Sequence, residues 1–275
     1  MRSLQNTLLL FTLASLFLVG LASAQSNFDA KPSLIDLADK YARCAVFVKT
    51  PKHSGTGTLF TIPFNDSSGK GSVLVITAKH LLANKEDAEG NAVDYYDSAL
   101  VMMRTKNGVI DTRHYVIDKL GSKDLDYAVL APLDVLRPFS EYDAAAPSVN
   151  HDVMSLSDVK PGETAIVTGF PFLIGSEPVI PVIQSGILAY IDSVHSEVFL
   201  DIPVSEGSCG GPVSCIDKND EVKLLGVVTE YHPTNREAAA SKEKHEGKDA
   251  PASLGKVILL KSILTEYKSS QTTAH

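Results

Sequence analysis

Short apolar runs separated by turn-forming residues dominate the chain from about residue 45 onward. The runs are rich in Val, Ile, Leu and Thr, and clusters of Gly, Pro, Asn and Asp interrupt them, which is the pattern of β-strands joined by turns. The expected strands are residues 45–49, 57–62, 73–77, 99–104, 109–116, 128–131, 164–168, 187–191, 197–202, 211–215, 224–229 and 257–260. Roughly a dozen short strands with few helices predict a closed β-barrel or a pair of barrels.

Three stretches depart from this strand pattern. Residues 33–41 are predicted to form a helix before the first strand. Residues 132–157 mix Pro, Ala and Asp without strand periodicity, so we interpret them as the linker between two lobes, formed by residues 25–140 and 141–275. Residues 233–253 combine charged residues with Gly and Pro flanks, which favours a surface loop.

The first 24 residues are typical of an export signal. Arg2 gives a positive start, an apolar stretch follows, and Ala22-Ser23-Ala24 supplies the small residues that a signal peptidase needs. We therefore expect cleavage before Gln25 and a mature protein that is secreted or periplasmic, where thiols tend to oxidise. An uncleaved membrane anchor is the alternative, although the apolar stretch is short for a membrane span. No later stretch is apolar enough to be transmembrane, so no stable membrane association is expected.

The composition narrows the classes of function. The 275 residues are 44% apolar and 21% charged, which excludes a disordered, collagenous or coiled-coil chain. The formal charge of -8 argues against a nucleic-acid partner, because binding phosphates requires a basic face. The sequence contains no metal-ligand spacing and no glycine-rich cofactor loop, so neither a metal nor a cofactor is expected. The three cysteines are an odd number, so at least one thiol has no disulfide partner within the chain.

Residues 207–212 (GSCGGP) place a nucleophile in a glycine-rich turn. Glycines adopt backbone angles that other residues avoid, so consecutive N–H groups can converge on one point and form an oxyanion hole. Taken alone, the segment is weak evidence for catalysis, and a tight turn beside a buried cysteine would be the preferred interpretation.

A histidine and an aspartate stand where two apolar runs meet a turn. His80 follows the strand 73–77 as a short helical turn begins, which suits a positioned general base. Asp126 precedes the strand 128–131, where its carboxylate can accept an imidazole N–H and stabilise the cation. Asp124 is the competitor for this role, and each residue could also be purely structural.

The order of the three groups carries more information than any one of them. His80, Asp126 and Cys209 follow one another in the order of the chymotrypsin-like arrangement. The first two lie in the first half of the mature chain and the nucleophile lies in the second half. A site in the cleft between two barrels requires this distribution.

The segments that hold these residues resemble the three signature segments of trypsin-like (chymotrypsin-fold) peptidases: residues 77–80 (TAKH), 126–130 (DYAVL) and 207–212 (GSCGGP). Four others resemble segments of the bacterial high-temperature-requirement proteases: residues 54–58 (SGTGT), 169–172 (GFPF), 225–229 (LGVVT) and 255–258 (GKVI). The likeness covers most of residues 43–265. It implies an all-β fold of two six-stranded antiparallel β-barrels, with the active site in the cleft between them and a polypeptide as substrate.

The sequence departs from the trypsin-like pattern at the nucleophile, because Cys209 stands where those enzymes carry Ser. Picornaviral cysteine proteases of the same fold also place Cys before Gly-Gly. We therefore expect a secreted endopeptidase that cleaves peptide bonds through His80, Asp126 and Cys209. The N–H groups of Gly207 and Cys209 are expected to form its oxyanion hole. Ser208 replaces the Asp of trypsin-like zymogens, so activation by insertion of a new N-terminus is not expected.

By the same resemblance, the primary specificity pocket has Pro203 and Val204 near its base and Thr229, Glu230 and Tyr231 along its wall. No acid occupies the base position, which favours a small or apolar residue before the cleaved bond.

Two questions stay open at the level of the sequence. Cys44 and Cys215 form either a disulfide bridge or two buried free thiols. The second hypothesis for function is a catalytically inactive pseudoprotease that grips extended peptides as a binding module. The presence of both His80 and Asp126 argues against this inactive binding module. The Cys209 thiol slightly favours it, because a thiol in a secreted protein is prone to oxidation.

Overall fold

The computed structural model describes residues 39, 41–63, 71–88, 92–123, 125–133, 138–171, 180–194, 197–202, 204, 207–216, 221–233 and 253–273. All of them belong to one compact unit, residues 34–275. The expected export signal lies outside the described residues, as does most of the helix expected over residues 33–41. At its end, Asp39, Tyr41 and Ala42 are helical.

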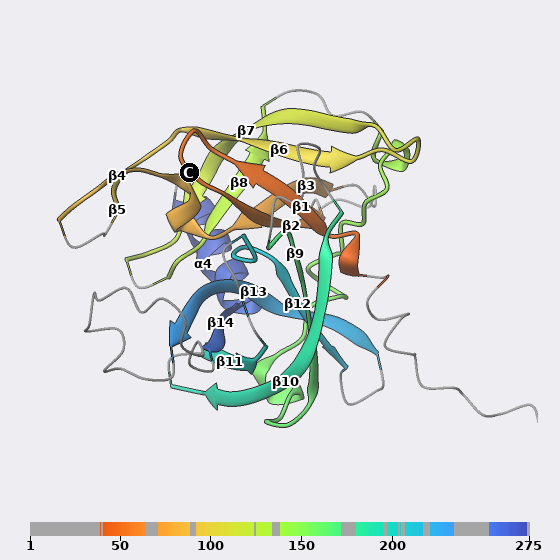
Figure 1. Ribbon diagram of the computed structural model, residues 1–275, viewed down its shortest axis with the longest axis vertical. Coiled ribbons are helices and arrows are strands. Elements are labelled where there is room, and N and C mark those ends of the chain that lie inside the picture. Colours follow the sequence, from red (N-terminus) through yellow and green to blue (C-terminus); the bar gives the residue numbers. More distant parts are fainter. Residues whose placement is uncertain are drawn as a thin grey trace, which may run out of the picture. The chain divides into compact units, whose positions relative to one another are not determined.

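Six antiparallel strands close the first barrel (Figure 1). They follow the order β1-β2-β3-β8-β7-β6, and β1 pairs with β6 to complete the circle. The strands are β1 (Ala45–Lys49), β2 (Ser54–Pro63), β3 (Gly71–Thr77), β6 (Ser98–Arg104), β7 (Ile110–Leu120) and β8 (Ala128–Pro132).

A second closed barrel has the order β10-β11-β14-β13-β12-β9. Its strands are β9 (Thr164–Gly169), β10 (Val182–Asp192), β11 (Glu197–Asp201), β12 (Pro212–Ile216), β13 (Val222–Pro233) and β14 (Ser253–Leu259). The prediction of two six-stranded antiparallel barrels is therefore confirmed.

Strand β3 shows why some apolar runs are continuous rather than alternating. Neighbouring side chains of a strand point to opposite faces. Val75 faces the core inside the first barrel, whereas Ile76 joins a cluster that also contains Val227 and Ile258 of the second barrel. Both faces of β3 are thus buried, which fixes the strand that leads to His80.

The sequence predicts no strand between β8 and β9, and among the described residues of this segment only isolated bridges occur. It contains the 3-10 turns η2 (Phe139–Glu141) and η3 (Leu156–Asp158). It is not a loose connection, because Tyr142 and Met154 are buried. The loop expected over residues 233–253 lies almost entirely outside the described residues.

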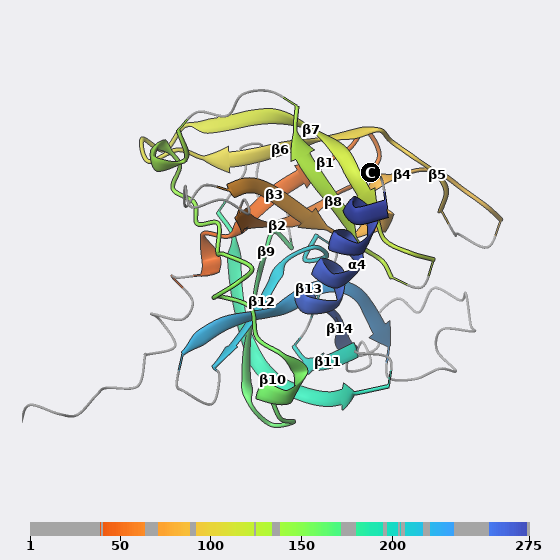
Figure 2. The ribbon, with the colours of Figure 1, turned by 180° about the vertical axis from the view of Figure 1, so that it is seen from behind.

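Two features were missing from the sequence-based expectation. A hairpin of β4 (Ala83–Glu86) and β5 (Ala92–Tyr95) projects from the first barrel, as Figure 1 shows. A helix, α4 (Leu260–Thr273), follows β14 directly. Its apolar residues pack into the cluster between the barrels, beside both Phe60 and Leu224, and Figure 2 shows the helix along the back of the molecule.

No helix in the described part of the chain is long and apolar enough to cross a membrane.

Candidate active site

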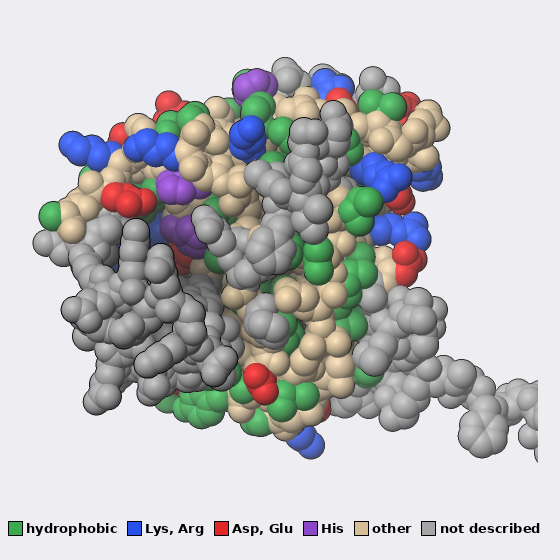
Figure 3. All heavy atoms as spheres, in the orientation of Figure 1, with side chains coloured by type: hydrophobic (Ala, Val, Ile, Leu, Met, Phe, Trp, Pro, Cys, Tyr) green, Lys and Arg blue, Asp and Glu red, His purple; other side chains and the backbone are tan. Residues whose placement is uncertain are grey.

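His80 is presented by a turn whose other residues anchor it. Strand β3 ends at Thr77, and the 3-10 turn η1 (Lys79–Leu82) begins two residues later. Leu81 and Leu82 are buried, so they hold the turn against the barrel. The His80 side chain keeps 46% exposure, as a base that must reach a substrate requires. Histidine side chains are indeed visible at the surface on the side where β4 and β5 project (Figure 3).

Asp126 contacts His80 at two points. Its Oδ2 lies 2.6 Å from Nδ1 of the ring, and its Oδ1 accepts the backbone N–H of His80 at 2.9 Å. The bond to Nδ1 leaves Nε2 as the ring nitrogen that faces the rest of the site. Asp124, the competitor in the sequence, lies outside the described residues.

Cys209 is the second residue, after Asp126, that favours the protonated form of the His80 side chain. Partial burial of the ring opposes its protonation, but the hydrogen bond to Asp126 and the charges of Asp126 and Cys209 outweigh this effect and raise the pKa of His80 from 6.5 to about 10. The structure thus brings together the three residues that the sequence order had singled out.

Two glycines shape the turn that carries Cys209. Gly207 and Gly210 have φ values of +92° and +86°, which L side chains rarely adopt. A Cβ at Gly207 would collide with the carbonyl of Phe170, and one at Gly210 would collide with the carbonyl of Thr56. The turn therefore needs glycine for both conformation and space.

Thr56 of β2 ties this turn to the first barrel. Its backbone N–H donates to the Cys209 carbonyl at 3.0 Å, and its Oγ1 donates to the Gly207 carbonyl at 2.6 Å. The same Oγ1 accepts the N–H of Phe170 at 3.0 Å, and Thr58 adds a bond from its Oγ1 to the Gly210 carbonyl at 2.8 Å. Thr56 and Thr58 lie in the SGTGT segment, but no feature of the sequence predicted a role for their side chains.

The carbonyls of Gly207 and Cys209 are thus held by Thr56, and their N–H groups remain available. Within the described part of the chain, neither N–H donates to a protein acceptor. Two N–H groups that no described residue accepts, held on a fixed turn, are what an oxyanion hole requires.

Ser208 is fully buried, and its Oγ has no hydrogen-bond partner among the described residues. A hydroxyl that solvent does not reach is poorly placed to attack a bound substrate. Cys209, which is partly exposed, is the accessible side chain of the pair.

The residues expected in the specificity pocket are only partly described. Val204 and Thr229 are buried, with 4% and 1% exposure. Glu230 and Tyr231 belong to β13, next to Thr229, and Pro203 lies outside the described residues.

None of the three cysteines is disulfide-bonded, so the alternative of a Cys44–Cys215 bridge is not realised. Cys44 lies in the cluster between the barrels and Cys215 in the core of the second barrel. Burial and the charge of Glu163 raise the pKa of the Cys215 thiol to about 12.

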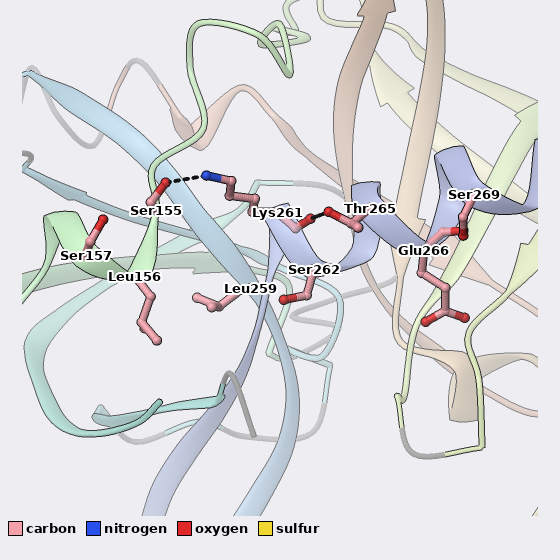
Figure 4. Close-up of a pocket in the computed structure, with 9 residues that line it drawn as sticks. All are labelled: Ser155, Leu156, Ser157, Leu259, Lys261, Ser262, Thr265, Glu266 and Ser269. Atoms are coloured by element: carbon pink, nitrogen blue, oxygen red, sulfur yellow. Dashed lines mark hydrogen bonds between the residues drawn. The ribbon is translucent and has the colours of Figure 1, made fainter. Parts of the chain in front are cut away.

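Among the described residues, no group of three or more His, Cys, Asp or Glu side chains could hold a metal ion. A groove of about 600 Å³ lies away from the site, between η3 and α4, and contains neither His80 nor Cys209 (Figure 4). Its lining is formed by Ser155, Leu156, Ser157, Leu259, Lys261, Ser262, Thr265, Glu266 and Ser269.

Solved structures of proteases share this fold. No curated protein matches the chain in sequence. The structure of Deg5 is similar with a TM-score of 0.52 at 15% identity, over 84% of this chain and 90% of that one. The serine endoprotease from Yersinia pestis gives a TM-score of 0.54 at 15% identity, over 86% of this chain but only 66% of its own. The Rv3671c protein of M. tuberculosis, in an inactive form, gives a TM-score of 0.50 at 16% identity, over 88% of this chain and 94% of that one.

At such identities these structures establish the fold alone. The family is established by the sequence. The family model of the trypsin-like peptidase domain matches residues 55–227, which include His80, Asp126 and Cys209. With two closed six-stranded barrels and a match over more than half of its length, the chain belongs to the trypsin-like peptidase family.

Proposed function

We propose that the chain is a secreted or periplasmic endopeptidase that cleaves polypeptides through Cys209, His80 and Asp126. The observation that carries the proposal is the His80 ring, whose Nδ1 lies 2.6 Å from the Asp126 carboxylate and whose pKa is raised by both Asp126 and Cys209. The peptidase family implies the polypeptide substrate. The cysteine chemistry and the export are our own inferences.

The first half of the reaction forms an acyl-enzyme. The Cys209 thiolate attacks the carbonyl carbon of the scissile peptide, a C–S bond forms, and the carbonyl electron pair moves onto oxygen. The N–H groups of Gly207 and Cys209 stabilise this oxyanion. When the intermediate collapses, the C–N bond breaks and the leaving amine takes the proton of the His80 imidazolium.

The second half releases the product. His80, now neutral, accepts a proton from water while the water oxygen attacks the thioester carbon. The C–S bond breaks, the sulfur leaves as thiolate, and the peptide departs as a carboxylic acid. Asp126 keeps Nδ1 protonated throughout, so that Nε2 always faces the reacting atoms.

On the resemblance to the family, we also propose that a pocket beside Val204 and Thr229, both of which are buried, takes a small or apolar side chain before the cleaved bond. The site would then reject Arg and Lys, whose charge would be desolvated without a partner.

The test compares thiol and serine reagents on the mature protein, residues 25–275. We expect iodoacetamide to alkylate Cys209 much faster than Cys44 and Cys215, whose side chains are 0% and 2% exposed. Casein cleavage should disappear in parallel, and His80→Ala should slow the alkylation. Cys215→Ser serves as the matched control and should retain both alkylation at Cys209 and cleavage.

Two outcomes would overturn the proposal. A fluorophosphonate adduct on Ser208 would show that the neighbouring hydroxyl is the nucleophile. A Cys209 as unreactive as Cys44, with no cleavage of any peptide library, would favour the peptide-binding module instead.

Export needs its own experiment. Expression of the full chain in a secreting host should give an extracytoplasmic protein whose N-terminal sequence begins at Gln25. A product that starts at residue 1 and stays with the membrane fraction would favour the uncleaved anchor.

A further inference from the structure

Helix α4 contacts the connection that carries Asp126. The connection between β7 and β8 contains Ser122, whose backbone N–H donates to Oε1 of Glu266 at 2.9 Å. Figure 4 shows the Glu266 carboxylate turned away from Lys261 and toward this connection. A carboxylate that accepts a backbone N–H makes a charge-assisted bond, stronger than a bond between neutral groups.

The same residue of the connection is held from its other side. Nζ of Lys79 donates to the Ser122 carbonyl at 2.8 Å, and Lys79 directly precedes His80. Ser122 is therefore linked both to α4 and to the turn that presents the proposed base.

A short series of backbone bonds relates Ser122 to Asp126. Leu125 donates its N–H to the Ser122 carbonyl at 3.2 Å, and Tyr127 donates its own to the Leu125 carbonyl at 3.0 Å. Gly121, on the other side of Ser122, donates to the Tyr127 carbonyl at 2.8 Å. Because these three N–H groups are bonded within the described part of the connection, a shift of Ser122 should reach Asp126.

The helix is itself firmly placed. Its Ile263 and Leu264 are buried in the cluster that also holds Tyr127, the neighbour of Asp126. Tyr267 donates from its hydroxyl to Asp118, near the end of β7. Burial and the nearby Glu266 carboxylate raise the pKa of Tyr127.

We infer that Glu266 is a positioning residue for the active site: by accepting the Ser122 N–H it fixes the connection that aims the Asp126 carboxylate at His80. This inference rests on the proposed function. Glu266 touches none of the reacting groups, and the charges that act on His80 are those of Asp126 and Cys209. Its effect is therefore transmitted by backbone position rather than by its own charge.

The experiment uses Glu266→Ala and Glu266→Gln in the mature protein, with Lys261→Gln as the matched control. Lys261 lies on the same helix, but its side chain bonds Ser155 instead of the connection. Two quantities are measured: the pKa of the His80 imidazole by NMR titration, and kcat and KM on a peptide substrate.

For Glu266→Ala we expect the His80 pKa to fall by roughly half a unit to one unit, because Asp126 is aimed less well. The kcat should fall roughly tenfold with KM little changed, as for a misplaced catalytic group. Glu266→Gln keeps an acceptor for the Ser122 N–H and should restore both values, and Lys261→Gln should leave both as they are.

The inference is wrong if Glu266→Ala leaves the His80 pKa at its original value. It is also wrong if Glu266→Gln loses as much as Glu266→Ala, or if Lys261→Gln shows the same loss, since the cause would then be charge or general weakening of the helix. The NMR titration needs no turnover. A wild-type protein that cleaves nothing would refute the proposed function while leaving this test intact.

Discussion

The Asp126 carboxylate holds His80 through two separate atoms, with Oδ1 on the backbone N–H at 2.9 Å and Oδ2 at 2.6 Å from Nδ1. One bond fixes where the turn lies, and the other fixes how the ring is rotated. A carboxylate is needed for both at once because it offers two acceptors and a negative charge.

Replacing this carboxylate by an amide should separate placement from charge. In Asp126→Asn the backbone bond can persist, but the imidazolium loses its counter-charge. We expect the His80 pKa to fall from about 10 toward its ordinary 6.5. The kcat for peptide hydrolysis should fall by about 100-fold or more. Asp201→Asn, an exposed acid on β11, is the control and should change neither quantity.

Thr56 should matter for the nucleophile turn although it touches no substrate. Thr56→Val keeps the shape of the side chain, yet it leaves the Gly207 carbonyl and the Phe170 N–H without their partner. Thr56 has 0% exposure, so the loss should cost about 1–3 kcal/mol in the free energy of unfolding, measured by urea titration.

Thr56→Ser retains the hydroxyl and is the control for this effect. Its stability should be closer to that of the natural protein than the stability of Thr56→Val. A loss in Thr56→Ser as large as that in Thr56→Val would contradict this account, because retaining the hydroxyl would then not have preserved the stability.

Two glycines with similar backbone angles allow the steric cost of an added Cβ to be separated from the cost of a positive φ. Gly210 and Gly162 have φ values of +86° and +90°. A Cβ at Gly210 would collide with the Thr56 carbonyl, whereas one at Gly162 has no atom within 4 Å. Gly162→Ala should therefore cost roughly 1–2 kcal/mol of stability, from the backbone conformation alone. Gly210→Ala should lower the stability more and should also abolish alkylation of Cys209. Equal unfolding midpoints for the two variants would contradict this account.

The sequence was informative where a candidate catalytic residue directly adjoins a strand. His80 and Asp126 each adjoin an apolar run that ends or begins in a defined way, so local pattern located them. Thr56 and Glu266 act on partners 151 and 144 residues away, and no local pattern reports such contacts.

The missed elements have a similar explanation. Strand β4 has the sequence ANKE, and it contains none of the β-branched residues that mark a strand. Helix α4 is rich in Ser and Thr, which are weak helix formers, and its stability comes from the buried face formed by residues such as Ile263 and Leu264. In both cases tertiary packing decided the structure.

The raised pKa of His80 also predicts how stability depends on pH. A group whose pKa is higher in the folded protein binds its proton more tightly there, so it stabilises the fold fully below its ordinary pKa. For His80 this contribution is complete below pH 6.5 and is lost as the pH rises to about 10. His80→Gln cannot titrate and lacks the contribution at every pH. The difference in urea midpoint between the natural protein and His80→Gln should therefore shrink steadily from pH 6.5 to 10. A difference that stays constant across this window would show that Asp126 and Cys209 do not stabilise the imidazolium.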